Sequence, residues 1–373
     1  MWNFSKLFSN RDTVENLKAN VRQGRVSHAQ IFFGKEGSEA LPVAFAYIKY
    51  LFCENRTEND SCGTCTYCKQ VDSLNHPDLK IIFPFPYSKG KIESSTDLLE
   101  DFLKQFKKNP YLDLFKFSQK ISAEKKSFSI PTSECESLIK FLGLKSFYGG
   151  KKIALIWYPE LINTAGANKI LKTIEEPSGD TLILLVSYNL HDVLPTVLSR
   201  CQVTHFKAPT LQETSEFLKE NFENISHHNP EILLQISDGN IGNILDILSN
   251  NNPFEEFEPI YSVFIEFITG NSPNKTLLYV LEKIEFLNSK GREFTKHFLN
   301  FFMNKIHDDF MIKNRDKFST DTLIELQKLV DHYTMLVERN ISIKMAIISL
   351  LIGSKNAFVT RNKSILIQEN ILV

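Results

Sequence analysis

A strand, a short glycine-containing loop and an apolar helix follow one another near the start of this chain, and they constrain its fold more than any other feature. Ala29–Phe33 has the apolar run of a buried strand, and Leu41–Leu51 has the composition of a helix. Between them, Gly34–Leu41 occupies the place of the pattern G-x-x-x-x-G-K-[ST], which holds phosphate in many nucleotide-binding proteins. The order of elements therefore predicts a phosphate-loop unit.

The loop lacks the side chains that carry phosphate chemistry. Glu39 stands where glycine lets the backbone approach a phosphate, Ala40 where lysine reaches the β- and γ-phosphates, and Leu41 where a hydroxyl holds Mg²⁺. Only Gly34 and Gly37 remain. We therefore expect no nucleotide cofactor in this loop and no ATP hydrolysis by this chain. The sequence leaves open whether a nucleotide binds to the backbone amides of the helix without being hydrolysed.

A second strand lacks the two carboxylates that an ATPase places at its end. Lys152–Trp157 is an apolar run, and in phosphate-loop ATPases such a strand ends in Asp-Glu, one carboxylate for Mg²⁺ and one for the attacking water. Here Trp157 and Tyr158 fill those places, and Glu160 comes two residues too late. Since two independent parts are absent together, the sequence argues against hydrolysis.

Four cysteines form the strongest candidate for a metal site. They have the spacing C-x8-C-x2-C-x2-C, at Cys53, Cys62, Cys65 and Cys68. Four thiolates can close a tetrahedral zinc site without an open position for water, so such a zinc is structural. The alternative is four unconnected buried cysteines. Zinc is favoured because clustered cysteine pairs in a reducing compartment are typical of metal sites.

The bulk composition excludes several classes of protein. The chain has 373 residues, with 43 Lys and Arg against 44 Asp and Glu, so its net charge does not steer it toward nucleic acid. No apolar run approaches the ~20 residues that span a bilayer, and the N-terminus lacks the core of a signal peptide. We expect a cytoplasmic protein without membrane contact.

The patterning along the chain predicts three domains. Residues 1–207, with the cysteine module at 53–68, alternate strand-like runs and amphipathic segments, which is typical of a mostly parallel sheet covered by helices. The strands are expected at 30–33, 79–83, 152–157, 181–187 and 203–206. Residues 208–250 predict a small helical domain and 251–373 an all-helical one. An insertion at about 84–129 carries lysines that either contact DNA or, as we favour, form a solvated face.

Several motifs together resemble those of one family. They are Ser27-His28-Ala29 before the loop, the four cysteines, His76-Pro77-Asp78, the Leu-Lys-Thr-Ile-Glu-Glu-Pro run that ends at Pro177, and Leu-Ser-Arg-Cys at 198–201. The chain resembles subunits of the bacterial DNA polymerase III clamp loader. It is similar to the delta-prime type rather than to the ATP-hydrolysing gamma/tau type, over residues from about Phe8 to Leu248.

The resemblance implies an AAA+-type α/β P-loop core with a small zinc module, a helical lid domain and a C-terminal all-α collar domain. It implies gamma/tau and delta clamp loader subunits as partners, and contact with the sliding clamp and primer–template DNA through the complex. The chain would belong to a DNA polymerase III holoenzyme and have no ATPase of its own.

The resemblance also implies roles for single residues. In the family, the arginine of the Ser-Arg-Cys motif projects into the ATP site of a neighbouring subunit, so Arg200, beside Ser199, would be an arginine finger acting in trans. An ion pair with a carboxylate of its own domain is the alternative. A sensor arginine of ATP-using relatives is replaced by Gly242. Two other functions remain as rivals, an ATP-hydrolysing gamma/tau-type subunit and a zinc-dependent DNA-binding adaptor.

Overall fold

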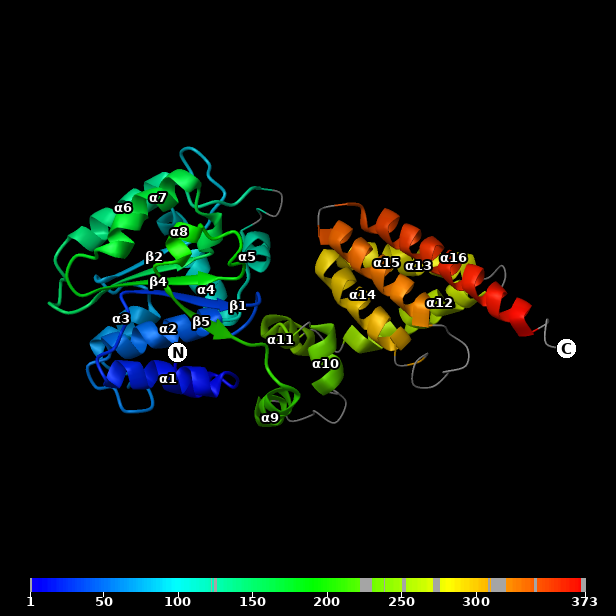
Figure 1. Ribbon diagram of the computed structural model, residues 1–373, viewed down its shortest axis with the longest axis horizontal. Helices are drawn as coiled ribbons and strands as arrows, with labels where there is room; N and C mark the ends of the chain where they lie inside the picture. The colour runs from blue at the N-terminus through cyan, green and yellow to red at the C-terminus, as the bar shows by residue number, and fades with distance from the viewer. Residues whose placement is uncertain are drawn as a thin grey trace. The chain divides into compact units, whose positions relative to one another are not determined.

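The computed structural model describes residues 2–121, 123, 126–221, 230–237, 239–249, 253–270, 276–307, 309, 320–338 and 341–369. The chain divides into two compact units, one of Met1–Glu223 with Asn240–Asn243 and one of Asn224–Gly239 with Ile244–Val373. The first unit contains a β-sheet, and the regular elements described in the second are helices (Figure 1). The finer division into three domains stays a prediction.

Five parallel strands form the sheet of the first unit. They lie in the order β2-β3-β4-β1-β5 and comprise β1 (Ala29–Gly34), β2 (Leu79–Ile82), β3 (Lys152–Trp157), β4 (Thr181–Ser187) and β5 (Gln202–Phe206). Two of the inner strands, β3 and β4, are buried along their whole length, which explains their continuous apolar sequences. The predicted fold class, an α/β core followed by helical regions, is confirmed.

Helices cover both faces of this sheet (Figure 1). One face carries α1 (Arg11–Arg22), α2 (Ala40–Phe52) and α3 (Thr66–Asp72), and the other carries α6 (Thr132–Gly143) and α7 (Thr164–Glu175). Side chains alternate between the faces, as they must in a strand. Phe32 and Leu155 belong to the hydrophobic cluster that includes α2, whereas Ile31 and Ile156 belong to the cluster that includes α6 and α7.

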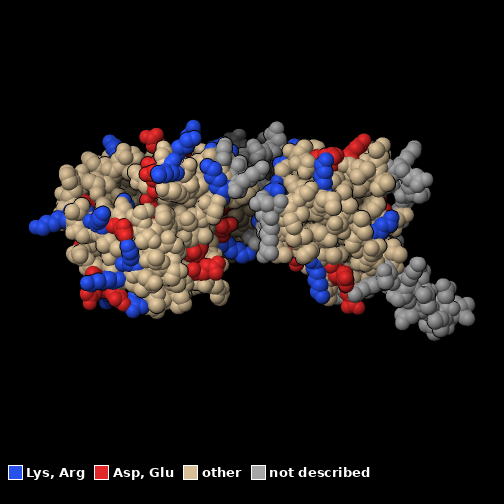
Figure 2. Space-filling view, turned by 90° about the horizontal axis from the view of Figure 1, so that it is seen from above, with Lys and Arg blue, Asp and Glu red and all other residues tan. Residues whose placement is uncertain are grey.

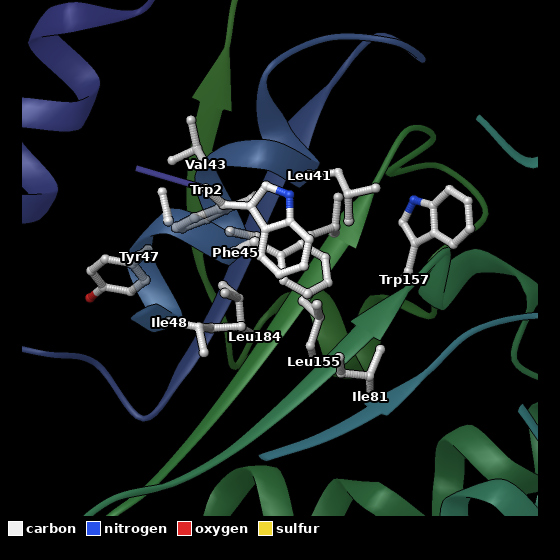
Figure 3. Close-up of a cluster of buried hydrophobic side chains, with 14 of the residues drawn as sticks. Trp2, Leu41, Val43, Phe45, Tyr47, Ile48, Ile81, Leu155, Trp157 and Leu184 are labelled. Atoms are coloured by element: carbon white, nitrogen blue, oxygen red, sulfur yellow. The ribbon is translucent and has the colours of Figure 1, made fainter. Parts of the chain in front are cut away.

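The predicted insertion at about 84–129 is part of the hydrophobic core. It contains η2 (Ser95–Leu98), α4 (Leu99–Lys108) and α5 (Leu114–Lys120). Phe106 of α4 is fully buried, and its ring centroid lies 4.4 Å from that of Phe45 and 4.9 Å from that of Trp2. Figure 3 shows Trp2 beside Phe45 in this cluster. The insertion therefore stabilises α2, the helix that follows the phosphate-type loop.

Short elements complete the first unit. They are η1 (Phe4–Lys6), η3 (Pro159–Leu161), α8 (Pro195–Leu198) and α9 (Leu211–Asn221). Helix α11 (Ile241–Ser249) begins in the first unit and continues in the second. The first turn of α11 therefore belongs to the same compact unit as the phosphate-type loop.

The regular elements that the structure describes in the second unit are packed helices. Besides most of α11, they are α10 (Pro230–Ile236), α12 (Pro253–Thr269), α13 (Thr276–Lys290), α14 (Arg292–His307), α15 (Thr320–Glu338) and α16 (Ile343–Glu369). Phe257, Phe264 and Phe298 form a buried aromatic cluster between α12 and α14, as the recurrence of apolar residues predicts. Among the residues that the structure describes, no helix is both long and apolar enough to cross a membrane.

Candidate functional site

The phosphate-type loop lies where the sequence predicts it, between β1 and α2. Gly34 ends the strand and Ala40 begins the helix. Gly37 adopts a φ of 70°, which favours glycine because a side chain is strained there. Ala40 and Leu41 are buried in the hydrophobic cluster. Two positions that a phosphate-binding loop uses for polar contacts are therefore apolar core.

Glu39 is completely buried, and its carboxylate binds the N-terminal segment of the chain. Oε1 accepts hydrogen bonds from the backbone amides of Phe8 at 3.0 Å and Ser9 at 3.2 Å. Oε2 accepts from the Ser9 hydroxyl at 2.6 Å and from Asn10 Nδ2 at 3.3 Å. Burial raises the pKa of Glu39, and these hydrogen bonds oppose the rise. The local sequence around Glu39 gave no sign of these partners, which lie about 30 positions earlier in the chain.

Backbone from the start of α11 covers the same loop. The amide of Ile241 donates to the carbonyl oxygen of Gly37 at 3.0 Å. A Cβ atom at Gly37 would overlap the side-chain amide of Asn240. A Cβ atom at Gly242 would lie 2.6 Å from the carbonyl oxygen of Tyr111. The position assigned to the sensor arginine is therefore too close to its neighbours for any side chain unless they move.

The end of β3 holds hydrogen-bonded aromatic residues in place of the two carboxylates. Tyr158, which has a φ of 58°, donates from its hydroxyl to Glu36 Oε1 at 2.7 Å and accepts from the amide of Leu114 at 3.0 Å. Trp157 Nε1 donates to the Tyr188 hydroxyl at 3.0 Å. Burial raises the pKa of both tyrosines well above the ordinary value, so their hydroxyls stay protonated.

Glu160, the displaced carboxylate after β3, has a structural partner. Its Oε1 accepts hydrogen bonds from the backbone amides of Tyr188 at 2.9 Å and Asn189 at 3.3 Å, directly after β4. Burial raises the pKa of Glu160, while these amides lower it. Glu160 therefore fixes the loop after β4.

The four predicted cysteines come together. The sulfur atoms of Cys53, Cys62, Cys65 and Cys68 all lie within 4.8 Å of one another. Backbone amides donate to three of them: Cys62 N to Cys53 Sγ at 3.2 Å, Cys65 N to Cys62 Sγ at 3.3 Å, and Cys68 N to Cys65 Sγ at 3.4 Å. Such amides stabilise thiolates, and those of Cys65 and Thr64 lower the pKa of Cys62 to about 6. Burial raises the pKa of the Cys53 and Cys68 thiols. The cluster therefore has the donors and the spacing to hold a metal ion such as zinc.

A buried lysine joins the cysteine cluster to α2. Lys49 Nζ donates to both carboxylate oxygens of Asp72, at 2.9 and 2.8 Å, and to Asn3 Oδ1 at 3.0 Å. Lys49 lies in α2, and Asp72 ends α3, which carries Cys68. Sequence reasoning missed this pair because nothing in the local pattern distinguishes a buried lysine from an exposed one.

Arg200 and Ser199 lie in the short connection between α8 and β5. The guanidinium group pairs with the carboxylate of Glu175 and donates to the carbonyl oxygen of Thr196 at 2.9 Å. The side chains of Arg200 and Glu175 are 37% and 44% exposed. The ion pair within the chain, one of the two alternatives, is thus present in this structure.

The sheet register separates Arg200 from the chain's own loop. Gln202, at the start of β5, pairs with Gln30, whereas Phe206, at its end, pairs with Gly34. Arg200 therefore lies toward the amino ends of the parallel strands, and the phosphate-type loop lies at their carboxyl ends.

Fold and site together define an α/β protein of the phosphate-loop class whose loop is filled by the chain's own side chains. The chain belongs to the family described as DNA polymerase III, delta subunit, whose profile matches residues 9–210. The resemblance to the clamp loader family, which the motifs predicted, is confirmed.

Curated relatives carry related names. The delta' subunit of DNA polymerase III from Bacillus subtilis is 28% identical over 241 residues, covering 64% of this chain and 59% of the relative. The Escherichia coli delta' subunit is 24% identical over 65% of this chain and 60% of the relative. The E. coli tau subunit is 24% identical over 66% of this chain and 32% of the relative. The match therefore spans about 60% of the length of these two delta' relatives.

One solved structure can be set beside this chain. It is a DNA polymerase III gamma subunit-related protein from Thermotoga maritima, with a TM-score of 0.43 and 13% sequence identity. The alignment covers 93% of this chain and 100% of the other.

Proposed function

We propose that this chain acts as a delta-prime-like subunit of a DNA polymerase III clamp loader and helps to load the sliding clamp onto primed DNA without hydrolysing ATP itself. One observation carries the second part of the proposal. The positions that handle phosphate and Mg²⁺ in an ATPase are engaged inside the chain, Glu39 with Phe8 and Ser9, and Tyr158 with Glu36. A triphosphate would have to displace these hydrogen bonds.

Arg200 is proposed as an arginine finger for the ATP site of a neighbouring subunit, with Ser199 beside it. Arg200 lies toward the amino ends of the strands, whereas the chain's own loop lies at their carboxyl ends. This position supports a role at the ATP site of another subunit. The pair with Glu175 is exposed, and exposed ion pairs are worth about 0–1 kcal/mol. Arg200 can therefore leave Glu175 for a phosphate at little cost.

The four cysteines are proposed to hold a structural Zn²⁺. When bound, the ion would neutralise converging thiolates, and four protein ligands would leave no position for a substrate. Lys49 and Asp72 already attach α3 to α2. Cys53 follows α2, and Cys65 and Cys68 belong to the start of α3. A shared metal ion would therefore link the two helices a second time.

The partners are proposed to be gamma/tau and delta subunits, with the sliding clamp and primer–template DNA contacted through the complex. The core at 1–207, the lid at 208–250 and the collar at 251–373 remain our proposed domains. Exposed apolar side chains support contact between the collar and partner helices, among them Leu277, Leu278 and Leu281 on α13 and Met345 and Ile352 on α16. A cytoplasmic location belongs to the same proposal.

The two rivals predict different behaviour. A gamma/tau-type ATPase would hydrolyse ATP as the purified chain, and changes in Gly34–Leu41 would abolish the activity. A zinc-dependent DNA-binding adaptor would bind DNA alone, with strong salt sensitivity, and lose binding on chelation. On the face shown in Figure 2, Lys and Arg side chains are interspersed with Asp and Glu, which offers little support for the adaptor.

The proposal is tested by co-purification and reconstitution. We expect the full chain to form a complex with gamma/tau and delta subunits, and to be required there for clamp loading onto primed DNA. We expect the purified chain alone to show no ATP hydrolysis above background. Hydrolysis by the chain alone, or clamp loading at the full rate without it, would contradict the proposal.

A further inference from the structure

The N-terminal segment, residues 2–10, is attached at both ends of α2. Near the end of the helix, Asn3 accepts a hydrogen bond from Lys49. In the middle of the helix, the ring centroid of Phe45 lies 5.0 Å from that of Trp2. Near its start, the amides of residues 8 and 9 donate to Glu39. The segment thus crosses α2 from the cysteine cluster to the phosphate-type loop.

Enough hydrogen-bond donors surround the carboxylate of Glu39 for it to remain in the interior. A buried carboxylate is costly unless hydrogen bonds replace the lost water. Four donors from Phe8, Ser9 and Asn10 converge on its two oxygens. Hydrogen bonds to an ionised acceptor are stronger than those between neutral groups. The carboxylate is therefore the centre of the contacts between α2 and the N-terminal segment.

Asn10 extends this network to the end of the sheet. Its Nδ2 donates to Glu39 at 3.3 Å and to the carbonyl oxygen of Lys207 at 3.1 Å. Its Oδ1 accepts from the amide of Lys207 at 2.8 Å. Lys207 directly follows β5 and leads toward α9. The Asn10 side chain therefore links the loop before α2 to the segment that leaves the sheet.

The N-terminal segment also contacts α9 itself. The rings of Phe8 and Phe217 are stacked, with centroids 4.2 Å apart and planes inclined by 21°. Phe8 is buried, and Phe217 belongs to α9. The residue whose amide binds Glu39 thus also holds the first helix after the sheet.

We propose that Glu39 is a positioning residue that closes the phosphate-type loop from within, by fastening residues 8–10 over it and through them fixing Lys207 and α9. In this role a side chain of the protein does what a bound anion does at the start of other phosphate-loop helices, where it orders the surrounding backbone. The inference goes beyond the proposed function, because it concerns the isolated chain and requires no partner subunit.

Amide hydrogen exchange on the full chain, resolved to single residues, tests this role. Glu39→Ala removes the acceptor of the Phe8 and Ser9 amides. We expect both amides to exchange at least about tenfold faster, because each loses a hydrogen bond to a charged group. We expect the Lys207 amide and α9 to exchange several-fold faster, and α6 and α7 to stay unchanged. Glu39→Gln keeps one carbonyl acceptor and should show a smaller change.

Two further variants separate positioning from a general loss of stability. Asn10→Gly keeps the left-handed backbone of Asn10, whose φ is 56°, and removes only the side chain. It should accelerate exchange at Lys207 and leave Phe8 and Ser9 protected. Glu100→Ala, at an exposed glutamate of α4, is the matched control and should change none of these amides.

The outcomes are decisive in both directions. The proposal is supported if amide exchange accelerates most in Glu39→Ala, less in Glu39→Gln and not at all in the control. The acceleration must also be confined to residues 8–10, Lys207 and α9. Unchanged exchange at Phe8 and Ser9 in Glu39→Ala would overturn it. A uniform acceleration that includes α6 and α7 would also overturn it, since Glu39 would then be an ordinary stabilising residue. If Glu39→Ala does not fold, Glu39→Gln and Asn10→Gly decide by the same criteria.

Discussion

Removing the guanidinium group of Arg200 should hardly change the stability of the isolated chain but should greatly reduce ATP hydrolysis by the assembly. Within the chain, Arg200 pairs with Glu175 and with the carbonyl oxygen of Thr196, and both paired side chains are more than a third exposed. An exposed pair contributes about 0–1 kcal/mol. Arg200→Ala should therefore lower the Tm of the isolated chain by at most about 4 °C.

The effect on the neighbouring ATP site should be far larger. Arginine fingers accelerate hydrolysis by about 10³–10⁵. This range corresponds to about 4–7 kcal/mol of transition-state stabilisation. We expect Arg200→Ala to assemble normally and to abolish most of the DNA-stimulated hydrolysis at the site that Arg200 serves. Arg200→Lys should recover only a small part, because lysine lacks the planar fork of donors.

The assay compares a reconstituted clamp loader that contains each variant, by steady-state ATP hydrolysis with clamp and primed DNA, with thermal unfolding of the isolated chain. Glu175→Gln is the matched control, since it breaks the same ion pair but leaves Arg200 in place. It should change the Tm as little as Arg200→Ala and leave hydrolysis intact. Normal hydrolysis with Arg200→Ala, or equal losses for Arg200→Ala and Glu175→Gln, would refute the finger assignment.

Three further predictions concern stability. Cys65→Ser should reduce zinc in the purified chain from about one per molecule and lower its Tm; elemental analysis that finds no zinc in the wild type would contradict the metal assignment. Phe106→Ala should lower the free energy of unfolding by about 3–5 kcal/mol in denaturant titrations, since a fully buried ring is lost, whereas a change below 1 kcal/mol would argue against its packing on α2. Burial lowers the pKa of His76 to about 4, against an ordinary value near 6.5, so the unfolded chain binds the proton more readily between these values. The contribution of His76 to the free energy of unfolding should be complete above pH 6.5 and fall by up to about 3 kcal/mol as the pH drops to 4. In denaturant titrations across this pH range, His76→Leu should show a smaller decline.

Local patterns were sufficient for the sheet and the cysteine cluster. Strands β3 and β4 are buried on both faces, so their sequences are continuous apolar runs that local inspection recognises. The cysteines lie within a short segment, and their spacing alone indicated a common site. The aligned positions of Glu39 and Tyr158 likewise pointed to a loop without its usual chemistry.

The contacts that fill the loop could not be predicted in the same way. Ser9 and Glu39 are 30 positions apart, Tyr158 and Glu36 are 122 apart, and Asn10 and Lys207 are 197 apart. Periodicity reports which face of an element is buried, but it does not report which distant segment covers that face. The apolar face of α4 was visible in the sequence, but its packing on Phe45 was not.

The filled loop also has a consequence for the evolutionary reversibility of this site. Replacing Glu39 by glycine would leave buried donors on Phe8 and Ser9 without an acceptor, and unmet buried groups cost about 1–3 kcal/mol each. A side chain at Gly242 would meet the carbonyl oxygen of Tyr111. Each single substitution toward an ATP-binding sequence would therefore reduce a small margin of stability before any nucleotide could compensate for it. Selection for stability would therefore oppose such substitutions when they occur one at a time.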